Sequence, residues 1–582
     1  MRLKRLFMLL SIGFIIIFLA ACTSSGKENS PSTIQDKASS EKSVNFVNKE
    51  NIPTMDPALA TDESSFAFLR STMGGLYRLN LDGKLVPELA TDHKVSADGL
   101  TWTFKIRENA KWENGDPITA NDFVYAWRRA IDPATGSEYG PYLMNNVIKN
   151  ATAISNGEMS PDQLGVRAED DFTLVVELEN PTPYFENLTS FGTLFPLNQK
   201  FVEEQGNKFA TSSDTLLASG PYKLTNWTST SDSWELVKND NYWDADTVQM
   251  DKIHFDVVKD PQTAANLYEE GSVDRVNLTS DLVDQYSGND DFVTIPNTFV
   301  YFIKFNQKAN DALANKNIRA AISRAFDKEA IVLEILNDGS IAANGLVPTG
   351  FVSMPESRED FRKVSGDLVT FDKTKAQKYW KKGLSEIGKD KVELELLADD
   401  DEATKSIVEY IANQLETNLP GLTVTIKQVP KEQRLDLEDA GDYQMEVSRW
   451  GPDFEDPYTF MSLFTTDSGN NKMGYSNAEY DQLISETSTT LATDNEARYK
   501  NFVKAEKILF DDAAIAPIYQ NARAELVNPK LTGVPNKPVV SAYEFKWLDI
   551  EEQKNKNAFP DRSVEGFFIF AEERNLCPNV KN

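Results

Sequence analysis

Residues 96–107 read SADGLTWTFKIR, and residues 111–125, slightly further on, read KWENGDPITANDFVY. The apolar residues of the first stretch alternate with polar neighbours, at Trp102, Phe104 and Ile106. Such alternation is typical of a strand with one buried face. In the second stretch, Asn-Gly-Asp-Pro at 114–117 favours a turn, and Thr119 stands where a helix N-cap is expected. The two stretches predict a strand, a turn and a helix in succession.

Other parts of the chain carry both kinds of periodicity. Alternating or continuous apolar residues predict strands at 172–179 and around 422–426. Apolar residues at helical spacing predict helices at 318–325 and 499–509. Strands and helices mixed in this order predict an α/β architecture with mixed sheets.

The amino-terminal residues predict export. Residues 1–5 carry three positive charges, and residues 6–21 are almost purely apolar, which is the layout of a secretory signal peptide. The apolar run is short for a membrane-spanning helix, which needs roughly 20 residues. It ends in Leu-Ala-Ala before Cys22 and so resembles the bacterial lipobox. We therefore expect a lipoprotein signal peptide at 1–21 and a lipid on Cys22; the alternatives are an uncleaved anchor or a soluble secreted protein.

The composition limits the possible partners. Residues 22–43 are polar and predict a flexible tether, while the tail at 551–582 has no assigned role. The net charge of −30 argues against a nucleic-acid partner, which requires a basic surface. The chain has two cysteines and two histidines, so we expect neither a disulfide framework nor a metal site built on imidazole.

Catalytic motifs are missing from the sequence. It contains no phosphate-binding loop of the Gly-x-x-x-x-Gly-Lys-Ser/Thr type, no Gly-x-Ser-x-Gly, no His-Glu-x-x-His and no Cys-x-x-Cys. We therefore expect a binding protein without a cofactor, not an enzyme; a cell-surface peptidase is the enzymatic alternative.

The two quoted stretches resemble the signature of the extracytoplasmic solute-binding proteins of family 5, which are the oligopeptide-, dipeptide- and nickel-binding components of ABC importers. Further landmarks of that family follow in family order, at 53–57, 75–77, 218–222, 241–243 and 450–457. Residues 137–143 and 164–168 resemble the oligopeptide-binding members more than the nickel-binding ones.

The resemblance implies a fold and its division into lobes. The fold is periplasmic-binding-protein-like (type II, cluster C), with two main lobes, a hinge and a small extra lobe. The first lobe is discontinuous, comprising 44–73, 190–298 and 519–550. The small lobe is 74–189, and the third lobe is 299–518.

The resemblance also implies a ligand and its contacts. The ligand is an extended peptide held by its backbone between closing lobes, with its α-amino group on Asp453. Trp450 and Gly451 lie against the peptide backbone, and the Tyr139 hydroxyl lies near its amino end. The alternatives are that Asp453 only caps a turn beside Pro457, and that Tyr139 and Trp450 only pack in the core.

One departure from the family concerns the ligand's carboxylate. Enteric members that fix short peptides place Arg, Lys and His near that carboxylate, whereas the matching positions here hold Val447 and Thr404. We therefore expect tolerance of longer peptides.

The implied partners are an ABC permease and its ATPase. The implied location is the extracellular face of a Gram-positive cell membrane, reached by a monomer through its lipid anchor. The alternatives are a receptor for signalling peptides of the pheromone type, for dipeptides or for nickel chelates, and a signalling or adhesive lipoprotein without transport.

Overall fold

The computed structural model describes residues 41–279, 281–534 and 544–551. The predicted signal peptide, Cys22, most of the predicted tether and the tail from 552 onward lie outside the described residues. The described residues from Lys42 onward belong to one compact unit, to which every contact below belongs.

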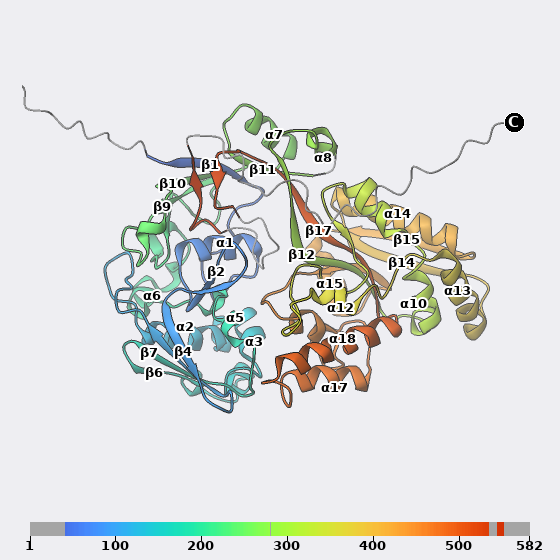
Figure 1. Ribbon diagram of the computed structural model, residues 1–582, viewed down its shortest axis with the longest axis horizontal. Helices are drawn as coiled ribbons and strands as arrows, with labels where there is room; N and C mark the ends of the chain where they lie inside the picture. Colours follow the sequence, from blue (N-terminus) through green and yellow to red (C-terminus); the bar gives the residue numbers. More distant parts are fainter. Residues whose placement is uncertain (1–40, 280, 535–543, 552–582) are drawn as a thin grey trace, which may run out of the picture. The chain divides into compact units, whose positions relative to one another are not determined.

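An eleven-stranded mixed sheet dominates this unit (Figure 1). Its strands, in spatial order, are β15 (Leu422–Val429), β14 (Val392–Asp399), β16 (Met445–Trp450), β12 (Phe292–Phe305), β17 (Ile515–Val527), β11 (Arg275–Leu278), β1 (Ser43–Asn48), β10 (Lys252–Val257), β9 (Ser233–Lys238) and β8 (Tyr222–Thr225). A short strand, β13 (Ile341–Ala342), also pairs with β17. Parallel pairs such as β14 with β15 occur beside antiparallel pairs such as β12 with β17, so the sheet is mixed, as predicted.

The two longest strands, β12 and β17, lie side by side in the middle of this sheet (Figure 1). Their pairing changes register between Pro296 and Val300 and again between Tyr301 and Phe302. On one side of the pair β16 continues the sheet, and on the other side β11 does so.

A separate four-stranded sheet contains the stretch that opened the sequence analysis. Its order is β4 (Ala90–Val95), β5 (Thr101–Ile106), β7 (Thr173–Glu177) and β6 (Val166–Asp170). After β5 the chain turns at Gly115, whose φ is +90°, and enters α2 (Ala120–Ile131). The Thr119 backbone N–H donates to the Asp122 carboxylate at 2.7 Å, which completes a capping box. The predicted strand, turn and helix are all present.

The other α-helices pack around the sheets. They are α1 (Glu63–Thr72), α3 (Tyr139–Met144), α4 (Ala151–Ser155), α5 (Phe185–Leu188), α6 (Gln199–Gln205), α7 (Pro261–Glu269), α8 (Asp281–Tyr286), α9 (Asp311–Ala314), α10 (Lys316–Ile322), α11 (Lys328–Ala330), α12 (Phe361–Ser365), α13 (Lys373–Ile387), α14 (Glu402–Asn418), α15 (Lys431–Ala440), α16 (Tyr458–Met461), α17 (Ala478–Thr487) and α18 (Asn495–Asp511). Two small antiparallel sheets pair β2 (Tyr77–Leu79) with β3 (Leu85–Pro87) and β18 (Leu531–Thr532) with β19 (Asp549–Ile550). None of the helices in the described part of the chain is both long and apolar enough to traverse a bilayer.

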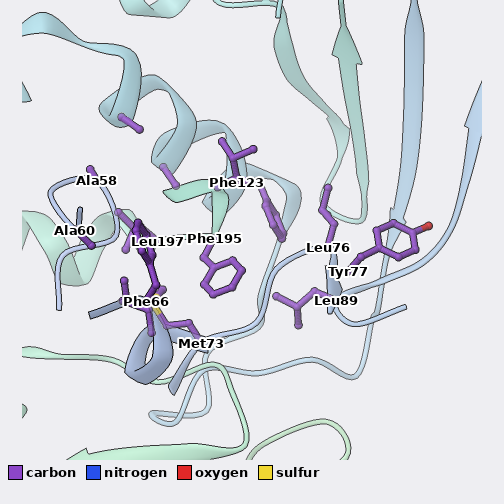
Figure 2. Packing of buried hydrophobic residues seen from close by; sticks show 14 of the residues in the cluster. Ala58, Ala60, Phe66, Met73, Leu76, Tyr77, Leu89, Phe123, Phe195 and Leu197 are labelled. Carbon is purple, nitrogen blue, oxygen red and sulfur yellow. The ribbon is translucent and has the colours of Figure 1, made fainter. Parts of the chain in front are cut away.

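Separate hydrophobic clusters support the two ends of the large sheet. The largest cluster joins α1, the four-stranded sheet and β8 to β10, and Figure 2 shows Phe66, Met73, Phe123 and Phe195 within it. Two further clusters contain residues between 300 and 519. The core is therefore divided among separate clusters, and residues of β12 and β17 belong to more than one of them.

Candidate functional site

A cavity of about 710 Å³ lies where distant segments meet. Its walls come from residues 50–79, 138–139, 187–195, 299–304, 431–438, 448–455 and 470. The four predicted ligand residues, Asp453, Trp450, Gly451 and Tyr139, all line this one cavity. Tyr139 is separated from the other three by more than 300 positions in the sequence, so the fold is what brings them together.

The loop after β16 carries three of these residues. Trp450 is the last residue of β16 and pairs with Val300 of β12, so the sheet determines where the loop starts. Gly451 follows, and a Cβ atom there would lie 2.4 Å from the ring of Phe299. This close approach is the physical reason for glycine at 451.

Asp453 is a partly buried carboxylate that one tyrosine contacts. The Tyr142 hydroxyl donates a hydrogen bond to Asp453 Oδ2 at 2.7 Å. Burial raises the pKa of the Asp453 carboxyl to about 6, and the bond from Tyr142 opposes that rise. No Lys, Arg or His of the described residues lies within 4.0 Å of this carboxylate. An acidic group placed in this way can accept an ammonium group from a ligand.

The same loop contains a second aspartate with a different role. Asp456 is buried and accepts from the Tyr458 backbone N–H at 2.9 Å. Its two oxygens also accept from the Arg498 guanidinium at 3.0 and 3.2 Å. The residue that caps the turn beside Pro457 is therefore Asp456, whereas Asp453 lines the cavity and bonds Tyr142.

Two aromatic contacts hold the loop from the side of the four-stranded sheet. Tyr184 stacks on Phe454 with ring centroids 4.4 Å apart, and it stacks on Tyr458 at 5.3 Å. Stacked aromatic pairs add free energy beyond the area that they bury. Together with the bond from Tyr142, they connect the loop to α3 and α5.

The contacts of the Tyr139 side chain are mainly packing contacts of its ring. Its ring stacks on Phe191 at 5.2 Å and meets Phe66 edge-on at 5.4 Å. Tyr142, three residues later on α3, is the tyrosine that bonds Asp453, and sequence reasoning missed it. Positions three apart share one helix face, so only that spacing could have suggested Tyr142.

The cations of the cavity do not come from the positions matched to the enteric proteins. Val447 is buried in β16, and Thr404 lies in the first turn of α14. The cavity wall instead contains six cations, Arg70, Arg78, Lys304, Lys431, Arg434 and Arg449.

Within residues 41–279, 281–534 and 544–551, no three His, Cys, Asp or Glu side chains gather as a metal site requires.

Comparisons with known proteins give consistent results. A family model described as bacterial extracellular solute-binding proteins, family 5 (middle), matches residues 84–472. The chain is 36% identical over 524 residues to a dipeptide-binding protein of Lactococcus lactis subsp. cremoris, covering 88% of this chain and 94% of that one. A structure of Listeria monocytogenes OppA bound to peptide matches with a TM-score of 0.76 and 42% identity, covering 88% of this chain and 100% of that one. The pheromone receptor PrgZ matches with the same TM-score and coverage at 36% identity. These likenesses confirm the predicted α/β fold of the periplasmic-binding-protein type.

Proposed function

Because the chain belongs to the bacterial extracellular solute-binding proteins of family 5, we propose that it is the peptide receptor of an ABC importer. Proteins of this family bind solutes and do not transform them, so the chain is not an enzyme. The observation that carries the proposal is Asp453, a carboxylate without a cationic partner in the described residues, placed in a cavity large enough for a peptide. The proposed partners are a permease and an ATPase, and the receptor acts as a monomer.

The ligand is an extended oligopeptide with a free amino group. Backbone hydrogen bonds of the kind that add a strand to a sheet give affinity without regard to sequence. Trp450 and Gly451 lie against that backbone, the Asp453 carboxylate pairs with the α-amino group, and hydrated space accepts the side chains. A micromolar complex requires only about −8 kcal/mol, which such contacts can supply.

Peptides longer than two residues are favoured by two features. The cavity of about 710 Å³ lies in the upper part of the range for drug-sized ligands, and a second cavity of about 280 Å³ adjoins it. Val447 and Thr404 supply no cation that would fix the terminal carboxylate at one distance. We therefore propose oligopeptides as ligands ahead of dipeptides or signalling peptides.

Titration of the mature chain with peptides of two to ten residues, each free or amino-acetylated, tests this proposal. We expect micromolar or tighter binding of free peptides that persists beyond five residues, because Val447 and Thr404 do not fix the far end. Acetylation should weaken binding strongly, because it removes the charge that faces Asp453. Calorimetry measures both effects. If only dipeptides bind, the protein is a dipeptide receptor. If no peptide binds, the proposal is refuted.

We also propose that the three lobes expected from the resemblance enclose this ligand. The first and third lobes meet at β12 and β17, which cross from one hydrophobic cluster to the next. The register shifts in that pair are a suitable place for hinge bending, because irregular pairing bends more easily than a regular ladder.

A lipid on Cys22 is proposed to hold the receptor on the extracellular face of a Gram-positive cell membrane. The apolar run before Cys22 and the polar residues after it support this placement. Metabolic labelling with a fatty-acid analogue should mark the wild-type chain, whereas Cys22→Ser should lose the label and enter the medium or remain as precursor. Cys577→Ser is the matched control and should keep the label. Equal labelling of Cys22→Ser and wild type would contradict the anchor.

A further inference from the structure

Arg449 stands apart among the cations that line the two cavities. It lies on β16 between Ser448 and Trp450, it is exposed, and it is part of the wall of both the larger and the smaller cavity. One guanidinium N–H donates to the Tyr301 hydroxyl at 2.7 Å. No carboxylate of the described residues comes within 4.0 Å of its guanidinium.

Arg78, Lys304 and Arg434 of the larger cavity already have carboxylate partners, whereas no carboxylate of the described residues lies within 4.0 Å of Lys431. Lys304 pairs with Glu438, and Arg434 donates from Nε to Asp399 at 2.7 Å. Arg434 also pairs with Glu446, which is fully buried. An anion that entered the larger cavity would have to displace these internal partners to reach Lys304 or Arg434. Arg449 requires no such exchange.

The Arg449 side chain is also held in place before a ligand arrives. Tyr301, which accepts its hydrogen bond, stacks on Tyr519 with ring centroids 4.4 Å apart. The guanidinium lies 5.7 Å from the Tyr301 ring centroid and 5.9 Å from that of Phe299. A guanidinium oriented by aromatic rings keeps further N–H groups available for a planar, bidentate partner, which is the geometry of a carboxylate.

The distance between Arg449 and Asp453 limits how far from the peptide's amine a carboxylate bound by Arg449 can lie. The two residues are four positions apart, and extended chain spans at most about 3.6 Å per residue, so their Cα atoms lie within about 14 Å. An extended ligand advances about 3.3 Å per residue. An extended ligand that starts with its amine at Asp453 and runs towards Arg449 reaches it within roughly its first five residues.

We propose that Arg449 binds a carboxylate of the peptide and makes the receptor selective for ligands that carry one close to the free amine. The carboxylate comes either from an Asp or Glu side chain or from a short peptide's own terminus. This inference rests on the proposed peptide function and adds a specificity that the positions of Val447 and Thr404 do not provide.

The test uses an eight-residue host peptide with a free amine, an amidated carboxyl end and Gln at positions 2 to 6. Single Gln→Glu changes at these positions probe the side-chain source at constant shape. Peptides of three to six neutral residues, with a free amine and either a free or an amidated carboxyl end, probe the terminal carboxylate as the source. Calorimetry with the mature chain gives the affinity ratio of each charged peptide to its neutral match. Arg449→Gln is the variant, and Lys431→Gln, which removes a positive charge from the same cavity wall, is the matched control.

We expect the charged peptide to bind about tenfold more tightly than its neutral match at one position or one length. Arg449→Gln should reduce this ratio to about one with an unchanged Tm, and Lys431→Gln should leave it within twofold. Affinity ratios near one in the wild type, or a ratio that is unchanged in Arg449→Gln, would overturn the inference. The proposed receptor function would still stand in either case, because neutral peptides would still bind. If no peptide binds at all, the proposed function and this inference fail together.

Discussion

Asp453→Asn should weaken the binding of free-amine peptides by roughly 100-fold, or about 2.7 kcal/mol. Asparagine keeps an oxygen that can accept from the Tyr142 hydroxyl, so the change removes the charge and little else. Amino-acetylation should cost the wild type a similar factor and should cost the variant almost nothing further. Calorimetric titration of the wild type and of Asp453→Asn, each with the free and the acetylated peptide, gives the coupling energy between the carboxylate and the amine.

The pH dependence of the same binding provides an independent check. Burial raises the pKa of the Asp453 carboxyl to about 6, so the group is charged above that pH and protonated below it. Because the charged carboxylate pairs with a protonated amine, wild-type affinity should fall as the pH drops through 6, and it should fall again above about 8, where the peptide's α-amino group loses its proton. Asp453→Asn should lack the fall near pH 6. Binding of free-amine peptides by Asp453→Asn within threefold of the wild type would exclude Asp453 as the partner of the amine.

Arg498→Met should lower the Tm by roughly 3–5 °C, corresponding to about 3–5 kcal/mol of lost stability. The substitution leaves the buried Asp456 carboxylate without its bidentate partner, and the Thr487 carbonyl loses the donor at 2.8 Å. Because Asp456 holds the loop that contains Asp453, peptide affinity should fall as well. Scanning calorimetry and peptide titration measure the two effects.

Lys507→Met is the matched control for that substitution. Lys507 lies on the same helix, α18, and forms an exposed ion pair with Asp511 at 2.6 Å. Pairs of this kind contribute little, so the Tm should stay within about 1 °C. Adding Asp456→Asn to Arg498→Met should recover part of the stability, because it removes the unpaired charge. Equal Tm values for Arg498→Met and Lys507→Met would mean that the buried pair does not hold the loop.

Local patterns predicted the fold well because they act over short distances. The alternation at 101–106, the turn at Gly115 and the N-cap at Thr119 each depend on neighbours within a few residues, and all three are present. The helix predicted at 318–325 is shorter in the structure. It ends at Ile322, with Ser323 as its C-cap, although the apolar spacing continues to Ala325.

The site was predicted less completely, since its contacts join distant segments. The resemblance indicated Asp453 and Tyr139, and both line the cavity. It could not show that Tyr142, 311 positions before Asp453, is the tyrosine that donates to it. Nor could it show that Arg434 and Lys304 have internal carboxylate partners while Arg449 has none in the described residues, because pairing depends on the packing of α15 against the sheet.

The position of β17 in the large sheet has a consequence for biogenesis. This strand, Ile515–Val527, is the link between β12 and β11, so a chain without it would have two half-sheets, each with an unpaired edge. During synthesis these edges stay open until almost the whole chain has emerged. The large sheet is therefore completed only after all the strands from β1 to β16 have been synthesised.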